Sequence, residues 1–307
     1  MIAYSAHENA QTLIDAASLG SVYALMAVGI GLVFGVLRLV NFAYGQLIMA
    51  GAYALALTNN LNPALSILVC FSVVIGLTTT MEVVAFRPLR SASPATMLVA
   101  TFAISFLLQS IALLKFGALG KPVATLTGLN RPIGNGTLIV RWIWIVAIVV
   151  AVVALGVLIL LLNRTPLGLH MRAAAADFRT ARLLGVRANA VISFAVLLSG
   201  VLAAAVAVIM TAEQPFVTSD FALRDTIIVL VGVVVGGIDR LWSATLGGFA
   251  IGFATGALAG FLPSTGSWPF TSGVYLDSAV FALVILVLLV RPSGLFVGRG
   301  RRAVERV

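Results

Sequence analysis

Apolar runs separated by short polar turns repeat along almost the whole chain. A run of about 18 or more apolar residues predicts a helix that spans a bilayer. Runs of about this length cover residues 16–37, 64–81, 94–114, 142–162, 190–211, 241–262 and 274–290. The pattern predicts an all-α, polytopic membrane protein with one transmembrane domain over residues 1–307.

Two further apolar stretches are shorter. Residues 226–238 form a run of only 13 residues, which suits a helix that crosses half of the bilayer. The run that ends at Leu57 begins with the polar residues Asn41, Tyr44 and Gln46. These residues either cap a helix in the headgroup region or belong to a broken segment that lines a cavity, where irregular backbone is tolerated. In total we expect about 8–9 transmembrane or half-membrane helices.

Composition supports lipid as the solvent of this chain. Charged residues make up 9% of it and apolar residues 61%, whereas an average soluble domain is about 25% charged. The net charge of +9 does not predict nucleic-acid binding, because the basic residues separate apolar runs instead of forming one patch. Cys70 is the only cysteine, which excludes an intramolecular disulfide and a cysteine-based metal site.

A central polar interval, residues 163–189, holds five arginines and one acid between two spanning runs. Basic loops of membrane proteins stay in the cytoplasm, so we expect this interval inside. Successive loops then lie on alternate sides of the membrane. With 226–238 counted as a crossing, 14 Lys and Arg residues lie on the cytoplasmic side and 5 on the outer side. The N-terminus is then outside and the C-terminus cytoplasmic. Whether 226–238 crosses completely stays open.

The segment before the first apolar run contains Glu8 and Asp15 and no Lys or Arg. A cleavable signal peptide has a positively charged segment at this place. We therefore expect the first helix to remain in the mature protein.

One predicted helix carries polar residues at helical spacing. Thr101, Ser105 and Gln109 are four residues apart, so they share one face of the helix. In hydrocarbon such a face turns toward other helices or toward water. Interhelical hydrogen bonding and the lining of a translocation path, together with Asn41, Tyr44 and Gln46, both remain open.

The run 241–262 contains glycines at strict four-residue spacing. These are Gly248, Gly252, Gly256 and Gly260. Small residues on one helix face let a second backbone approach closely, so this stripe predicts helix packing.

The sequence offers no catalytic constellation. It has no Walker-type Gly-rich phosphate loop, so we expect that it does not hydrolyse ATP and that it binds no cofactor or metal. The spans also lack the ionisable residues that proton- or sodium-driven transporters use, since Glu82 and Lys115 sit at run ends from which they can reach the interface. The chain is therefore not expected to be an enzyme. An independent secondary transporter or channel remains the alternative to an ATP-driven system.

Within the central interval, residues 173–184 lack proline and glycine and predict a helix that stops at Gly185. Leu183 and Leu184 form a small apolar edge beside Arg179 and Arg182. A helix of this kind binds anionic lipid or a groove on a partner protein, and the residues themselves favour neither.

Four segments, in the same order along the chain, carry a family resemblance. They are GSVYALMAVGIGLVFGVLRLVNFAYGQLIMAGAY (20–53), AFRPLRSASPATMLVATFAISFLLQ (85–109), RTPLGLHMRAAAADFRTARLLGV (164–186) and LLVRPSGLF (288–296). The sequence resembles the branched-chain amino-acid type permeases of ABC importers, in particular the smaller of their two permease subunits. The similarity covers nearly the whole chain.

The resemblance implies an ABC importer permease fold in a bacterial inner membrane. It implies ATPase subunits that use ATP, a second homologous permease subunit and an extracytoplasmic substrate-binding protein as partners. Whether the permease pair consists of identical or different subunits stays open. The implied substrates are branched-chain or related amino acids, and other small polar solutes such as amides and urea are not separated from them.

The resemblance also implies a coupling loop at about residues 164–188 that inserts into an ATPase subunit. The family's Glu-Ala-Ala…Gly signature corresponds here to Arg179-Thr180-Ala181 with Gly185, and the glutamate is absent. The residues expected at this contact are Arg172, Arg179, Thr180, Ala181, Arg182, Leu183, Leu184 and Gly185.

Overall fold

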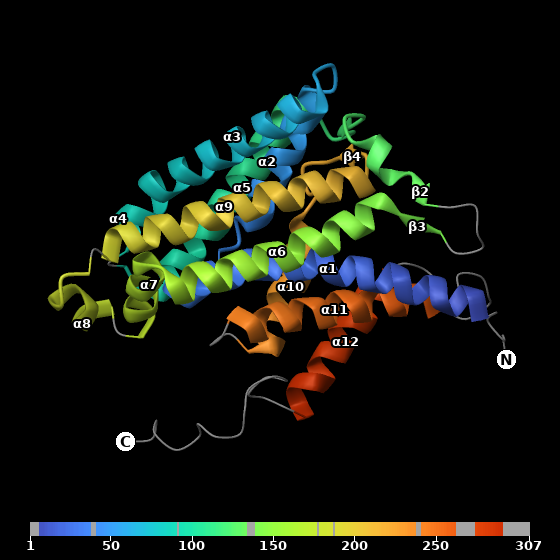
Figure 1. Ribbon diagram of the computed structural model, residues 1–307. Helices are drawn as coiled ribbons and strands as arrows, with labels where there is room; N and C mark the ends of the chain where they lie inside the picture. Colours follow the sequence, from blue (N-terminus) through green and yellow to red (C-terminus); the bar gives the residue numbers. More distant parts are fainter. Residues whose placement is uncertain are drawn as a thin grey trace.

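The computed structural model describes residues 6–37, 41–90, 92–133, 139–176, 178–186, 188–237, 241–261 and 274–290. These residues form a bundle of helices (Figure 1). In chain order the helices are α1 (Ala6–Leu37), α2 (Tyr44–Leu57), α3 (Pro63–Met81), the π-helical turn η1 (Glu82–Phe86), α4 (Arg87–Leu89), α5 (Pro94–Phe116), the 3-10 turn η2 (Thr127–Asn130), α6 (Trp142–Arg164), α7 (Pro166–Ala176), α8 (Phe178–Leu183), α9 (Ala188–Glu213), α10 (Leu223–Gly236), α11 (Leu241–Phe261) and α12 (Val274–Val290).

Two small antiparallel ribbons close one end of the bundle. β1 (Lys121–Pro122) pairs with β4 (Phe216–Val217), and β2 (Pro132–Ile133) pairs with β3 (Val140–Arg141). We call this the strand end. The helices α7 and α8 lie at the opposite end, which we call the α7–α8 end (Figure 1).

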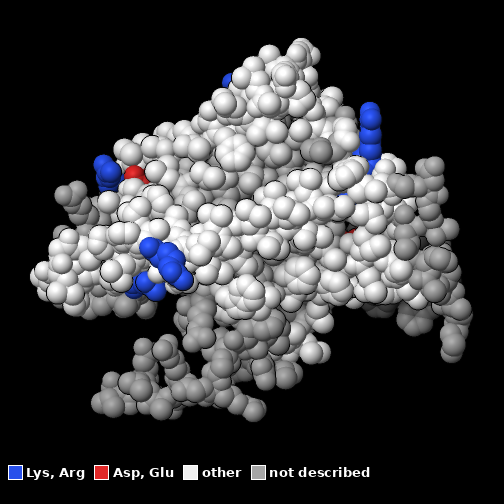
Figure 2. Space-filling view, in the orientation of Figure 1, with Lys and Arg blue, Asp and Glu red and all other residues white. Residues whose placement is uncertain are grey.

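Six helical stretches of the described chain are long and apolar enough to cross a membrane. They cover residues 9–35, 63–89, 95–116, 142–164, 190–213 and 241–261, and Tyr44–Leu57 and Ser278–Val287 are shorter apolar helices. This confirms the predicted all-α, polytopic class. Figure 2 shows a broad white surface between the two ends of the bundle, with Lys and Arg toward the ends.

The centre of the bundle is built around α1 and α11, which run antiparallel. A side chain at Gly252 would meet the Cα of Gly20 at 2.9 Å, and one at Gly256 would meet the Cα of Ala16 at 2.6 Å. Gly248 lies in the same way against Ala27, and Gly260 against Thr12. The glycine stripe therefore faces α1 along its whole length, and the two backbones touch because no side chain separates them.

Two half-length helices begin in the middle of the bundle. α2 and α10 each have 14 residues, or about 21 Å at the helical rise. Their N-terminal ends meet, since a side chain at Gly45 would lie 2.6 Å from Thr226 Oγ1 and 2.9 Å from the carbonyl oxygen of Ala222. From there α2 runs to the strand end and α10 runs antiparallel to α11 toward the α7–α8 end. The short run 226–238 is thus a half-helix that begins slightly earlier than expected.

The end of α3 differs from the sequence-based expectation for Glu82. Arg87–Leu89 continues the helical path as α4, because the wide π turn, in which the Arg87 N–H donates to the Glu82 carbonyl, carries the helix past Pro88. Glu82 does not reach the interface but is buried, because its carboxylate has partners inside the protein.

Two helix boundaries also differ from the sequence-based expectation. The helix predicted over 173–184 begins earlier, since α7 starts at Pro166, and its described residues belong to α7 and α8. The first helix begins at Ala6, ten residues before the apolar run at 16. Its extra N-terminal turns are held by contacts with the strand end, where Gln11 Nε2 donates to the Ile139 carbonyl at 3.0 Å.

Candidate functional site

The first candidate site is the α7–α8 end. α7 starts at a Thr-Pro pair, because Thr165 caps the helix through a 3.1 Å bond from the Gly168 N–H to its Oγ1, and Pro166 tolerates the first helical position. Met171 and Ala174 are buried against the bundle. The α7 helix is therefore anchored, and it carries α8 away from the spanning helices (Figure 1).

α8 ends in a Schellman-type cap. Gly185 has a φ of +84°, and the Val186 N–H donates to the Ala181 carbonyl at 3.0 Å, closing the bond pattern that such a cap requires. Ala181 is 3% exposed, whereas Leu183 and Leu184 are 84% and 79% exposed. The helix thus presents two leucines outward from a rigid turn.

The predicted coupling residues all fall at this end. Thr180 and Arg172 are exposed, and Arg172 donates to the Asn163 side chain at 3.3 Å. Arg179 and Arg182 lie on α8, but their side chains are outside the described part of the structure. The intervening Asp177 is also outside it.

A buried ionic network, which the sequence did not predict, lies beside α7 and α8. The Glu82 carboxylate accepts hydrogen bonds from Arg90 and, at 2.7 Å, from Ser193 on α9. Arg90 also contacts Ser193 Oγ at 3.2 Å. Burial lowers the pKa of the Arg90 guanidinium, while the charge of Glu82 acts in the opposite direction. The network joins the end of α3 to the start of α9, close to the proposed coupling helices.

The predicted path residues on and before α2 are all enclosed. Asn41 accepts a 3.0 Å hydrogen bond from the Ala43 N–H, and Tyr44 and Gln46 are at most 1% exposed. Among the described residues, the Tyr44 hydroxyl and the Gln46 Oε1 find no hydrogen-bond partner. A buried polar atom without a hydrogen-bond partner lowers the stability of the fold. The α2 helix carries such atoms at the centre of the bundle.

The path residues on α5 lie on its inward face. Thr101 and Ser105 are buried and Gln109 is half-buried, and Thr101 donates to the Leu98 carbonyl at 2.9 Å. α5 packs against α2, where Phe116 stacks on Tyr53 with ring centroids 4.2 Å apart. The structure therefore places the two predicted groups of path residues on neighbouring helices.

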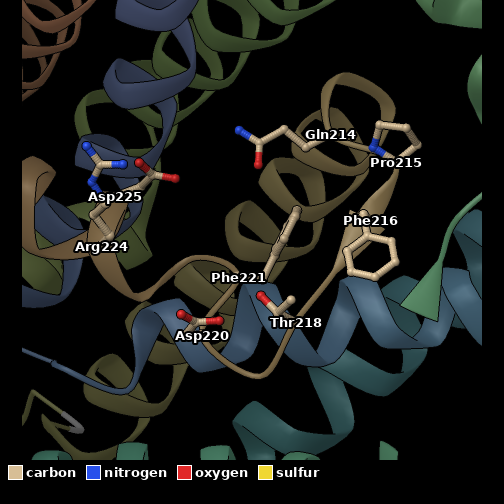
Figure 3. A pocket seen from close by; sticks show the side chains of 8 residues that line it. All are labelled: Gln214, Pro215, Phe216, Thr218, Asp220, Phe221, Arg224 and Asp225. Carbon is tan, nitrogen blue, oxygen red and sulfur yellow. The ribbon is translucent and has the colours of Figure 1, made fainter. Parts of the chain in front are cut away.

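A pocket of about 560 Å³ lies near the strand end, between β4 and the start of α10. Its polar lining consists of Gln214, Thr218, Asp220, Arg224 and Asp225. Figure 3 shows the Gln214 amide and the Asp225 carboxylate directed toward each other across it. Sequence analysis missed this site, although the polar stretch between two apolar runs was visible there.

Two hydroxyl groups of α1 hold acids next to this pocket. The Tyr23 hydroxyl donates to Asp225 at 2.7 Å, and the Ser18 hydroxyl donates to Glu213 at 3.3 Å. Among the described residues, no group of three or more His, Cys, Asp and Glu side chains could hold a metal ion. The pocket is lined by charged and hydrogen-bonding groups.

Known proteins resemble this chain over nearly its full length. Residues 12–290 match the family described as branched-chain amino acid transport system / permease component. The permease BraD of Pseudomonas aeruginosa is 30% identical over 311 residues, covering 97% of both chains. The permease LivH of Escherichia coli K12 is 28% identical over 315 residues, again covering 97% of both. Both relatives are described as parts of high-affinity branched-chain amino acid transport systems.

A solved structure supports the fold. An inward-facing structure of a metal-chelate type ABC transporter superposes with a TM-score of 0.52 at 17% identity, covering 92% of this chain and 87% of that one. The shared architecture and the full-length match agree with the helical bundle described above. The chain belongs to the family of permease components of branched-chain amino acid transport systems.

Proposed function

We propose that this chain is the transmembrane permease subunit of an ATP-driven importer for branched-chain or related amino acids. The observation that carries the proposal is α8, which presents Leu183 and Leu184 to the outside of the bundle. Burying a leucine side chain in a partner contributes about 1.5–3 kcal/mol. Two adjacent leucines on a capped turn thus supply a compact contact for an ATPase subunit.

The charges support the placement of this contact in the cytoplasm. Of the cations expected inside, six lie in the described chain, and all six belong to the α7–α8 end. They are Arg87, Arg90, Arg164, Arg172, Arg179 and Arg182. If the α7–α8 end faces the cytoplasm at a bacterial inner membrane, α1 starts on the opposite side and the N-terminus is extracytoplasmic.

The family and the absence of a Walker-type phosphate loop from the sequence support separate partner subunits. ATP would be bound by separate ATPase subunits, and a second permease subunit would complete the pathway. A substrate-binding protein would deliver the amino acid at the strand end. In this scheme the chain itself binds no cofactor and conducts the solute past α2 and α5.

ATP-driven movement would enter through α8 and spread through two contacts. α7 transmits it to the bundle through buried Met171 and Ala174, and the Glu82–Ser193 contact ties α3 to α9. Because α1 and α11 touch backbone to backbone, they move as one body. The polar atoms of Tyr44 and Gln46 that have no partner among the described residues favour α2 as the element whose surroundings change.

The docking role is tested by replacing Leu183 and Leu184 with aspartate in the assembled transporter. The change removes apolar contact worth about 3 kcal/mol or more, which weakens association at least 100-fold. We expect the ATPase subunits to be lost from the detergent-solubilised complex and leucine uptake to cease. Leu119→Asp is the matched control, since Leu119 is 87% exposed near the strand end. Retention of the ATPase subunits by the double variant would contradict the proposal.

The alternative is that the chain transports a solute without ATP. Reconstitution of the chain alone in liposomes, with imposed proton or sodium gradients, separates the two functions. We expect no gradient-driven leucine uptake, because the described spans hold few ionisable side chains. Accumulation of leucine under these conditions would favour the secondary transporter.

A further inference from the structure

The pocket between β4 and α10 has a composition that the docking function of α8 does not explain. It lies where residues 214–222 turn from the strand end into the middle of the bundle. We propose that this pocket recognises the zwitterionic head group of a free amino acid during translocation. The proposal rests on the proposed function for the substrate class and assigns that substrate a site on this chain.

The charges of the pocket match both ends of a zwitterion. Asp220 and Asp225 supply carboxylates for an ammonium group, and Arg224 supplies a guanidinium for a carboxylate. Charged side chains at membrane depth are costly and mark solute pathways. Arg224 and Asp225 lie in the first turn of a half-helix that starts in the middle of the bundle, so these two charges indicate a binding role more than a packing role.

The acid closest to the centre is held in place. The Tyr23 hydroxyl on α1 donates to Asp225 at 2.7 Å, so the carboxylate is oriented by a helix that belongs to the rigid α1–α11 pair. Asp225 and Glu213 are close enough to interact electrostatically. A fixed acid in an acidic surrounding is a better partner for an ammonium group than a mobile surface acid.

The start of α10 adds partial positive charge next to Arg224. Ala222, the N-cap residue, provides no side-chain hydrogen bond to the first helical turn. Half-helix ends in transporters point such N-terminal dipoles at anionic groups of the substrate. The carboxylate of an amino acid is the anion that suits this position.

The remaining wall is apolar, and the space is large enough. Phe216 and Phe221 line the pocket beside the charges (Figure 3) and would contact an aliphatic side chain. The volume of about 560 Å³ falls in the range of about 300–1,000 Å³ that is typical of small-molecule sites. The site thus suits an amino acid with an apolar side chain.

The first test measures binding of tritiated L-leucine to the purified complete transporter, without its binding protein, by scintillation proximity. Asp225→Asn keeps an oxygen that can accept the Tyr23 hydrogen bond and removes only the charge. We expect Asp225→Asn and Arg224→Gln each to weaken leucine binding about tenfold or more. Asp15→Asn and Arg131→Gln, which remove the same charges outside the pocket, should bind as the wild type does.

Competitors that lack one head group test the assignment of charges. In the wild type, 3-methylbutylamine and 4-methylpentanoate should compete at least about tenfold more weakly than leucine. Arg224→Gln should narrow the gap between leucine and the amine, and Asp225→Asn the gap between leucine and the acid. Equal binding by all pocket variants and controls would overturn the proposal.

A transport measurement separates this proposal from the proposed function and from misfolding. With the binding protein present, Asp225→Asn should keep ATP hydrolysis within about twofold and move about tenfold less leucine per ATP. If Asp225→Asn does not assemble, Asp220→Asn in the exposed loop takes its place. If the wild type takes up leucine and the variants transport as much leucine per ATP as the wild type does, the proposed role of the pocket is overturned and the proposed function is not. Absence of wild-type uptake of any branched-chain amino acid overturns the proposed function.

Discussion

The helices α1 and α6 show that the more apolar helix is the less buried one in this molecule. In the apolar stretch of α1, 83% of the residues are buried, against 17% in the more strongly apolar α6. The outer surface of α6 is made of residues such as Val152 and Leu160, each at least 60% exposed. Lipid accepts such side chains as readily as the protein does. The helix with more small and polar residues therefore goes inside.

The largest effect is expected when the same substitution, glycine to leucine, is made in a buried helix and in a lipid-facing helix. Gly252→Leu on α11 would drive a side chain into the backbone of α1, because its Cβ already meets Gly20 Cα at 2.9 Å. A Cβ at Gly156 on α6 would meet no described atom within 4 Å, so Gly156→Leu is the matched control. We expect the first variant to yield no monodisperse protein in fluorescence-detected size exclusion and the second to behave as wild type. Equal damage by both would break the comparison.

A buried charge gives the next largest effect. Glu82→Ala leaves the partly buried Arg90 without its carboxylate, and the cost of breaking a fully buried pair, about 3–5 kcal/mol, is the upper bound for this change. We expect a clear loss of thermal stability in detergent. The double variant Glu82→Ala/Arg90→Met should recover most of it, because no uncompensated charge remains. A double variant as unstable as the single one would show that Glu82 acts through packing.

The central helix α2 separates stability from transport. Gln46→Leu removes a buried oxygen that has no partner among the described residues, so we expect stability to rise by about 1 kcal/mol. Leucine uptake should fall several-fold if the path runs past Gln46. Tyr53→Phe removes the same kind of atom from the same helix and should leave uptake unchanged. Equal uptake in both variants would remove Gln46 from the path.

The smallest effect is expected at Gly185, a glycine that is needed for its backbone conformation and not for helix packing. A Cβ at Gly185 would meet no described atom within 4 Å, but the residue has a φ of +84°, so Gly185→Ala costs about 1 kcal/mol through backbone strain. We expect looser binding of the ATPase subunits with an unchanged melting temperature of the bundle. A lower melting temperature would show that α8 belongs to the core.

The membrane helices and their order follow from apolar run lengths, and the half-helix at 226–238 follows from its brevity. The glycine stripe on α11 was visible from its four-residue spacing, but the helix it faces was not. The start of α7 at Pro166 and the π turn at Glu82–Phe86 were not predicted. The π turn carries Glu82, whose partner Ser193 lies on α9, 111 residues later in the chain.

The candidate sites divide in the same way. Leu183, Leu184 and Gly185 could be singled out because a local helix and its stop signal are encoded by neighbouring residues. The pocket at α10 could not, since its acid at 225 is oriented by Tyr23, about two hundred residues earlier in the chain. Local chemistry shows in the sequence, whereas long-range pairing does not.

By itself the sequence determined that lipid is the solvent, which segments are helical and where small residues permit close approach. Only the tertiary structure decided which helix faces lipid, which starts in mid-bundle and which charges share a pocket. The physical reason is that a bilayer and a protein interior are both apolar. A spanning helix therefore carries little mark of which side faces its neighbours, and packing between helices makes that choice.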